Sequence, residues 1–191
     1  IGGHGGVNIL NTVERFDSQL EVWGAVAPMP TARYGVAAVS LGGRIYAMGG
    51  STRGPNGATT ASEMYDPEQD VWQALAPMPT ARCYLAAASL DGRIFAIGGE
   101  SADRTLATVE RFDPEQGVWQ TLAPMPTART GLAAASLGGR LYAIGGWNNG
   151  PLATVDRFDP EQGVWQAVAP MPTARSGLTA VSLGSRLYAI G

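Results

Sequence analysis

One stretch of this sequence occurs four times. Each copy holds a tryptophan and, a few residues later, the heptapeptide Ala-Pro-Met-Pro-Thr-Ala-Arg. The copies carry the tryptophans Trp23, Trp72, Trp119 and Trp165 and end at the arginines Arg33, Arg82, Arg129 and Arg175. A period of 46 to 49 residues predicts a repeat architecture, because each unit of such a fold buries its apolar surface only against its neighbours.

One part of each repeat has a fixed length and another part does not. The fixed segments run 36 residues from a strand-like start to a glycine, and they are 13–49, 62–98, 109–145 and 155–191. The connection that leads to the start of the next segment varies between 10 and 13 residues. One loop per repeat is therefore free to change.

The composition is that of a globular chain with one sizeable core. Of its 191 residues 45% are apolar and only 15% are charged, and the net charge is -3. Without a basic excess, long-range electrostatics predict neither nucleic acid nor an acidic membrane surface as a partner. A local cluster of arginines can still bind a carboxylate or a phosphate.

The sequence leaves the cellular compartment open, with the cytoplasm favoured. The single cysteine, Cys83, cannot form an internal disulfide, and no apolar run is long enough to cross a bilayer. No charged segment followed by a hydrophobic stretch marks a secretion signal. The chain starts at Ile1 and stops within a repeat at Gly191, so we interpret it as a piece of something longer, or as a processed or engineered unit.

Within a repeat the pattern is that of β-strands. The apolar runs 34–41 and 44–48 flank Gly42-Gly43, which predicts a tight hairpin. A second hairpin is expected from 62–66 and 71–75, since the Asp-Pro step between them favours a turn. No segment shows a sustained helical period. Four strands per repeat without helices predict an all-β fold of β-propeller blades, each with four antiparallel strands.

Three recurring features resemble the kelch family. They are the glycine pairs Gly49-Gly50, Gly98-Gly99 and Gly145-Gly146, the aromatic-Asp-Pro steps at 65–67, 112–114 and 158–160, and the tryptophan that follows each step. The resemblance extends over the whole chain. It implies a ring of four-stranded blades around a central channel, usually a platform that binds proteins.

We expect one kelch-type domain over 1–191 with four repeats. Its units are a partial one at about 1–30, three full ones at about 31–79, 80–126 and 127–172, and a partial one at about 173–191. The two partial units can complete one blade together in a closed four-bladed ring, which hides the sheet edges. Alternatively the chain is an arc of a larger propeller, or half of an eight-bladed dimer, and it can then self-assemble.

The residues that all copies share have structural interpretations. Each repeat tryptophan is expected to pack between blades, and each glycine pair to provide a backbone conformation or close approach that a Cβ would block. The acidic-arginine pairs, such as Glu110-Arg111, are expected to be solvated or to form ion pairs within a blade. A Gly-Gly step without a following helix and lysine is no nucleotide loop.

Function is expected where the copies disagree. The residue after the shared arginine is Tyr34, Cys83, Thr130 or Ser176, and the next one is glycine in three copies but Tyr84 in the second. In a four-stranded meander this position and the variable loop lie at the same end of the sheet. We therefore predict one face that carries both variable regions.

A partner-binding site is predicted on this face. Its candidate residues are Arg33, Tyr34, Arg82, Cys83, Tyr84, Arg129, Thr130, Arg175, Ser176, Arg53, Arg104, Trp147 and Asn149. Four guanidinium groups at one mouth suit carboxylates or phosphate. With equal weight, these arginines tie each blade to its neighbour by bonding backbone carbonyls. Trp147 is the one tryptophan outside the repeat register, and it is either an interface anchor or a residue that packs across a neighbouring loop.

The sequence argues against catalysis. Some kelch-type propellers are copper oxidases that use two histidines, but this chain has only His4. No cluster of histidine, cysteine and carboxylates suits zinc or iron, so we expect no metal and no cofactor. A nucleophile on Cys83 needs a base, and His4 is far away in the sequence.

These observations predict a non-catalytic scaffold for protein-protein interactions. Its partner is a protein or peptide, with an acidic segment as one option, and neither nucleic acid nor a membrane. The alternatives are a purely structural or designed repeat assembly without a natural ligand, and a glycan-binding or enzymatic propeller in which Trp147 stacks on a sugar.

Overall fold

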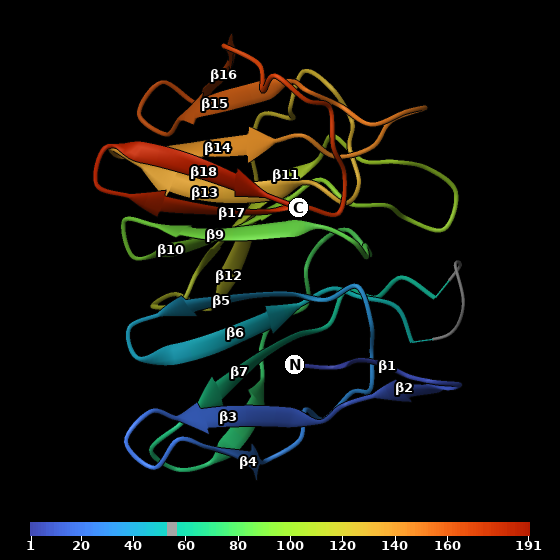
Figure 1. Cartoon of the computed structure of the whole chain (residues 1–191), viewed down its shortest axis with the longest axis vertical. Coiled ribbons are helices and arrows are strands. Elements are labelled where there is room, and N and C mark those ends of the chain that lie inside the picture. The colour runs from blue at the N-terminus through green and yellow to red at the C-terminus, as the bar shows by residue number, and fades with distance from the viewer. Residues whose placement is uncertain (53–56) are drawn as a thin grey trace.

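A computed structural model describes residues 1–52 and 57–191, and Arg53, one of the predicted contact residues, lies outside them. The described residues form eighteen strands and no helix (Figure 1). Twelve of these strands make three four-stranded antiparallel sheets, each in simple meander order. The predicted all-β fold of four-stranded blades is thereby confirmed.

The three complete blades follow one another along the chain. The first contains β5 (Ala37–Leu41), β6 (Arg44–Met48), β7 (Ser62–Asp66) and β8 (Val71–Ala74). The second contains β9 (Ala86–Leu90), β10 (Arg93–Ile97), β11 (Val109–Asp113) and β12 (Val118–Thr121). The third contains β13 (Ala133–Leu137), β14 (Arg140–Ile144), β15 (Val155–Asp159) and β16 (Val164–Val168).

Turn chemistry fixes these meanders. The hairpin between the first two strands of a blade turns through residues with positive φ, such as Gly42 and Gly43 at 58° and 75°. In the hairpin between the third and fourth strands, Asp66 accepts backbone N–H bonds from Glu68 and Gln69 at 3.0 and 3.4 Å. The register is the same in each blade, with Ile45 opposite Tyr65 and Ile94 opposite Phe112.

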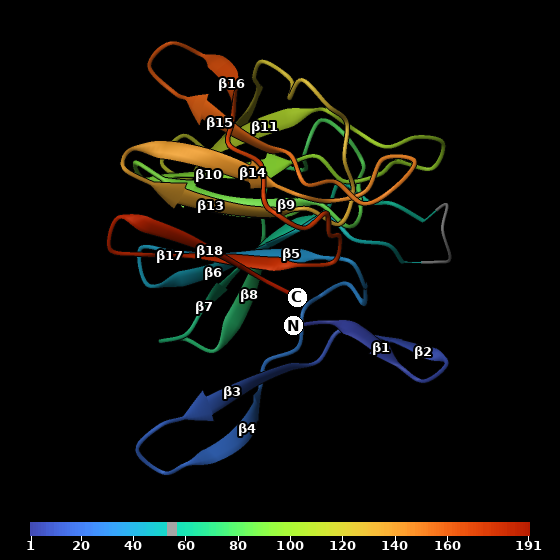
Figure 2. The same ribbon diagram turned by 45° about the horizontal axis from the view of Figure 1, so that its top comes forward.

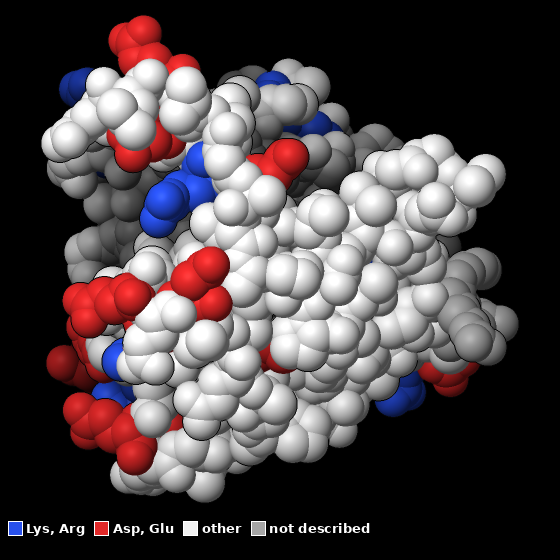
Figure 3. All heavy atoms as spheres, turned by 90° about the horizontal axis from the view of Figure 1, so that it is seen from below, with Lys and Arg blue, Asp and Glu red and all other residues white. Residues whose placement is uncertain are grey.

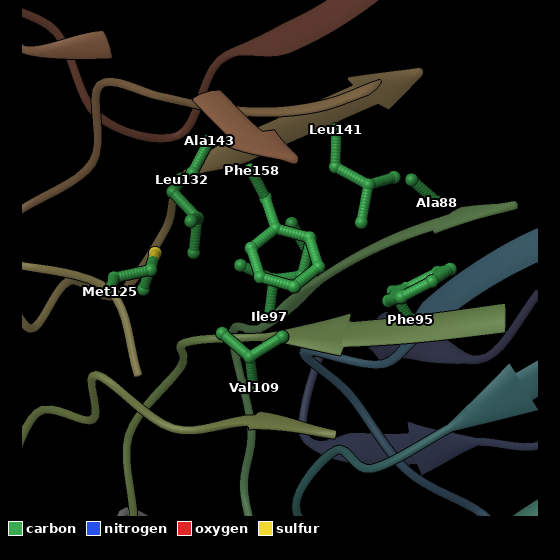
Figure 4. Close-up of a cluster of buried hydrophobic side chains, with 10 residues drawn as sticks. Ala88, Phe95, Ile97, Val109, Met125, Leu132, Leu141, Ala143 and Phe158 are labelled. Atoms are coloured by element: carbon green, nitrogen blue, oxygen red, sulfur yellow. The ribbon is translucent and has the colours of Figure 1, made fainter. Parts of the chain in front are cut away.

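The blades pack face to face in an arc. Their innermost strands, β5, β9 and β13, contact one another in sequence, and β17 (Thr179–Leu183) continues the series. Small side chains from all four strands, Ala88 and Ala135 among them, line one common channel. Between the second and third blades, Phe95, Ile97 and Phe158 form an apolar core together with Leu141 (Figure 4).

The chain ends form three separate hairpins. They are β1 (Gly3–Gly5) with β2 (Asn8–Leu10), β3 (Val13–Asp17) with β4 (Val22–Val26), and β17 with β18 (Arg186–Ile190). By repeat position, β3-β4 is the outer half of a blade and β17-β18 is the inner half. The two halves lie apart in Figures 1 and 2 and belong to different sheets. Of the arrangements that the sequence left open, this structure shows the open arc and not the closed ring.

Candidate binding face

The two variable regions of each repeat lie side by side, as the meander predicts. Tyr34 pairs with Ser51 through two backbone bonds of 3.1 and 2.8 Å, and Cys83 pairs with Glu100 through two bonds of 2.9 Å. Thr130 pairs with Trp147 in the same way, at 3.1 and 2.8 Å. In three repeats the residue after the shared arginine is therefore joined to the residue after the glycine pair.

These paired segments gather at one end of all the sheets, which we call the loop face. In Figure 1 it lies to the right, with the β1-β2 hairpin beside it, and the tight hairpin turns of the blades lie to the left. Figure 3 shows the side on which β3-β4 lies. There most charged side chains gather toward the end with the hairpin turns, and a broad area without charged side chains lies between that end and the loop face.

The shared arginines do not line the mouth of this face, which corrects one of the two interpretations that the sequence allowed. Arg33, Arg82 and Arg129 are 0% exposed. The guanidinium of Arg82 donates from Nη1 to the carbonyls of Gly98 and Thr108 at 3.0 and 2.9 Å. These three arginines cannot contact a partner through their guanidinium groups.

Each buried arginine joins two successive blades. The backbone N–H of Arg82 donates to Thr59 O in the loop of the first blade at 3.2 Å, whereas its side chain reaches into the second blade. There it forms an ion pair of 2.9 Å with Glu110, which is also fully buried. Arg33 pairs with Glu63 at 2.7 Å in the same way. Glu110 is thus not solvated, and the arginine with which it forms an ion pair in the second blade is Arg82 instead of Arg111.

Burial controls the electrostatics of these joints. Desolvation lowers the pKa of the Arg82 and Arg129 guanidinium groups, and the partner carboxylates oppose that change. Desolvation also raises the pKa of the Asp156 carboxyl, which pairs with Arg129. Both pKa changes arise because the charged groups are held away from water. An anionic ligand therefore cannot reach these guanidinium groups.

Arg175 differs from the other three arginines. It is partly exposed, and its Nη1 donates to Gly191 O at 2.9 Å, as Arg129 donates to Gly145 O. No acidic side chain pairs with it among the described residues. Among the four shared arginines, the one without an acidic partner in the described part of the chain is thus the one whose blade is incomplete.

Backbone bonds link the four repeats around the mouth of the channel. Tyr84 N donates to Gly35 O at 2.8 Å, Gly131 N donates to Tyr84 O at 2.9 Å, and Gly177 N donates to Gly131 O at 2.8 Å. The same four residues, with the apolar residue that follows each, line a shallow pocket of about 210 Å³. Every repeat therefore presents the same backbone position to one opening.

Tyr84 is the exception at this opening. Its φ is +50°, in the left-handed region, where the other three repeats have glycine with φ between 57° and 68°. A side chain in this conformation costs about 1–2 kcal/mol relative to ordinary backbone. The ring is 42% exposed, and its centroid lies 6.0 Å from that of Tyr34. Burial against the face and the nearby Tyr34, Cys83 and Glu100 raise the pKa of Tyr84.

The aromatic patch extends to the N-terminal hairpin. The His4 ring in β1 lies 4.2 Å, centroid to centroid, from the ring of Tyr34. The sequence analysis named Tyr34 as a candidate contact but did not predict its contact with His4, because 30 positions separate the two residues and only the folded chain brings them together. The sequence did contain a signal for Tyr84, because this residue replaces a glycine that the other three copies share.

Cys83 faces inward and not toward a partner. It is 1% exposed, and its Sγ lies 3.8 Å from Oε1 of Glu100. Burial raises the pKa of the thiol to about 11, and the Glu100 carboxylate is the second cause of this increase. The predicted contact through Cys83 is therefore wrong, and the thiol at neutral pH is the protonated form, which is a poor nucleophile.

The remaining predicted residues are distributed over the loop face with different exposure. Trp147 is 47% exposed, and Arg104, Asn149 and Ser176 are exposed as well, whereas Thr130 is half-buried. Asn149 has φ 55° in the turn after Trp147, a conformation that asparagine tolerates. Tyr34, Tyr84 and Trp147 are the three aromatic residues of the predicted set, and none of them is fully buried.

Residues 1–52 and 57–191 hold no group of three or more histidine, cysteine, aspartate or glutamate side chains placed as metal ligands. The same part of the chain contains no helix with the length and apolar character needed to span a membrane.

Comparisons with known proteins concern the family and the fold of this chain. A family model described as the KLHDC2/KLHL20/DRC7 Kelch-repeats domain matches residues 1–191. Kelch-like protein 35 from Homo sapiens is 37% identical over 54 residues, which are 28% of this chain and 9% of that protein. Kelch-like protein 35 from Mus musculus is 37% identical over 60 residues, 31% of this chain and 10% of that protein. The chain thus spans about a tenth of the curated relatives that it matches.

The solved structure of YjhT resembles this fold with a TM-score of 0.82 at 14% sequence identity. The match covers 94% of this chain and 68% of that chain. At this identity the likeness concerns the arrangement of the blades, and it carries no information on a shared site.

Proposed function

Because the chain belongs to the kelch-repeat family, we propose that it is a non-catalytic platform that binds a protein or peptide on the loop face. The observation that carries this proposal is the conformation of Tyr84. A tyrosine stands at φ +50° where three sister repeats have glycine, and its ring is 42% exposed beside the channel mouth. Residues other than glycine that are held in the left-handed region cluster at functional sites.

The chemistry of the face supports aromatic and apolar contacts over charge recognition. Tyr34 and Tyr84 form an edge-to-face pair, His4 packs on Tyr34, and Trp147 is 47% exposed on a neighbouring loop. Tyrosine and tryptophan are the side chains that most often anchor protein interfaces. Since three of the four shared arginines are buried in ion pairs, the proposed partner does not include the acidic segment that the sequence left as one option.

A substitution that the chain itself suggests tests this proposal. Tyr84→Gly makes the second repeat like the other three, removes the ring from the face and keeps both backbone bonds at the channel mouth. We expect the free energy of unfolding to stay within about 1 kcal/mol of its original value, because relief of the left-handed conformation offsets the lost ring contacts. Urea denaturation measures this.

Peptides selected from a displayed library on the intact chain then serve as ligands. Tyr84→Gly and Trp147→Ala are each expected to weaken binding at least about tenfold. Trp23→Ala is the matched control, because Trp23 is 70% exposed on β4 and away from the loop face. Binding that survives both loop-face substitutions and is lost with Trp23→Ala would move the site to the blade flank and contradict the proposal.

A further inference from the structure

The variable positions of the loop face carry one acidic side chain and several aromatic rings. These positions are the residue after each glycine pair, with Gly2-Gly3 as the first pair, and the two residues after each shared arginine. In chain order they hold His4, Tyr34, Gly35, Ser51, Cys83, Tyr84, Glu100, Thr130, Gly131, Trp147, Ser176 and Gly177. Glu100 is the one acidic residue of this set, and the set contains no lysine or arginine.

Glu100 differs from the structural acidic residues because it has no cationic partner. The shared arginines and the arginines of the hairpin turns form ion pairs with Glu63, Glu110, Asp156, Asp66, Asp113 and Asp159. Within residues 1–52 and 57–191, no basic side chain forms an ion pair with Glu100, although this residue is half-buried. A carboxylate that is partly removed from water favours a cation beside it.

The contacts of Glu100 place its carboxylate next to Tyr84. Its backbone pairs with Cys83, which precedes Tyr84, through two bonds of 2.9 Å. Oε1 of Glu100 accepts a bond from Cys83 Sγ at 3.8 Å, and a neutral thiol is a weak donor that does not balance the charge. The Glu100 charge also contributes, after burial and the nearby Tyr34 and Cys83, to the raised pKa of Tyr84.

The tyrosine rings hold aromatic surface beside this carboxylate. The Tyr84 ring rests on the first repeat, where a Cβ on Gly35 would lie 3.1 Å from Cδ1 and 3.2 Å from Cε1 of the ring. Tyr84 is nevertheless 42% exposed, and its ring meets that of Tyr34 at an angle of 65°. A cation within about 6 Å of the centroid of such a ring is attracted by its negative face.

An aromatic ring next to an unpaired carboxylate suits a cationic side chain. The arginine guanidinium matches both groups, because it stacks on aromatic faces and donates to a carboxylate through two N–H groups. Given the proposed function, on which this step rests, we infer that the loop face binds a basic side chain of its peptide partner between the Tyr84 ring and the Glu100 carboxylate. Arginine is preferred to lysine in this site.

Selection from a displayed library of random peptides tests the charge preference. We expect peptides selected on the intact chain to be enriched in arginine or lysine at one position and depleted of aspartate and glutamate there. Glu100→Gln should lose this enrichment. Glu115→Gln is the matched control, because it removes the same charge from an exposed turn at the opposite end of the second blade and should keep the enrichment. The frequencies of arginine and lysine at that position distinguish the two side chains.

A double-mutant cycle separates direct contact from a structural role of Glu100. A selected arginine peptide is compared with the same peptide carrying citrulline, which has the shape of arginine without its charge. The arginine peptide should bind the intact chain at least about tenfold more tightly than the citrulline peptide, and less than about threefold more tightly in the Glu100→Gln chain. Isothermal titration calorimetry measures the four affinities, and urea denaturation checks that Glu100→Gln remains folded.

Two substitutions at Tyr84 test the part that the ring plays. Tyr84→Phe keeps the aromatic face and should leave the affinity for the arginine peptide within about threefold of its original value. Tyr84→Leu has a side chain in the same backbone conformation but no aromatic face, and it should weaken binding of the arginine peptide at least about fivefold.

The outcomes distinguish this site from the platform as a whole. Peptides that bind the intact chain and lose binding with Tyr84→Gly, but show no enriched basic residue, would overturn the inference and leave the proposed function in place. An equal preference for arginine over citrulline in the intact and Glu100→Gln chains would have the same meaning. A library from which no peptide binds the intact chain would contradict both.

Discussion

The complete blades and the two half-blades are built from nearly the same repeat, but they bury it very differently. Phe112 and Phe158 are each 2% exposed, whereas Phe16, at the same repeat position, is 48% exposed. Ile144 is 3% exposed, and its counterpart Ile190 is 56% exposed. A repeat residue is therefore a core residue only when the strands next to it are present.

The same contrast applies to polar groups. Arg82 and Glu110 are both fully buried and paired, but Arg175 is partly exposed without an acidic partner, and Glu14 is exposed. Because an ion pair gains from burial only when both members are present, the shared arginine stabilises a complete blade and contributes little to an incomplete one. The difference between the two regions can be measured directly.

The largest expected difference concerns these arginines. Arg82→Ala leaves the buried Glu110 carboxylate without its partner and should destabilise the chain by about 3–5 kcal/mol. Arg175→Ala should cost less than about 1 kcal/mol, because no ion pair is lost. Urea denaturation of both variants measures this. Equal losses would show that the arginine acts through its carbonyl bonds alone.

A second contrast concerns the ring of the third strand. Phe112→Ala opens a cavity in a packed core and is expected to cost about 3–4 kcal/mol. Phe16→Ala should change the free energy of unfolding by no more than about 1 kcal/mol, because the residue is already 48% exposed. A large loss from Phe16→Ala would mean that the two half-blades pair within one chain.

The smallest contrast concerns the glycine that follows the second strand. A Cβ on Gly98, whose φ is +61°, would lie 2.6 Å from Arg129 O, so Gly98→Ala should cost about 2–3 kcal/mol. At Gly191 the nearest atom to such a Cβ is 3.4 Å away, and Gly191→Ala should cost about 1 kcal/mol or less. Thermal unfolding separates the two variants, and a similar loss in both would assign the cost to φ instead of the clash.

Much of the fold could be predicted from the repeats, because turn chemistry and alternation act over a few residues. The Gly42-Gly43 turn, the Asp66 turn and the pairing of the two variable regions all follow from local sequence. The sequence also singled out Tyr84, since comparison with three sister copies shows that a glycine is replaced there. Local rules are enough for these features.

Burial and closure depended on the tertiary structure. From the sequence alone, Arg82 was equally expected to contact a partner or to connect two blades. The same type of residue serves either role until its neighbours are known. Its contacts with Gly98 and Thr108 arise only when the chain folds back over 16 to 26 residues. Likewise, only the packing of whole blades places His4 on Tyr34.

The sequence by itself determined the blade, its turns and the face that varies, because these depend on interactions between residues close in the chain. Only the tertiary structure decided which copies of a shared residue are buried, which ion pairs form, and that β3 and β18 stay apart in one chain. The physical reason is that burial depends on neighbouring blades, and a repeat sequence specifies each blade in the same way whether or not a neighbour follows.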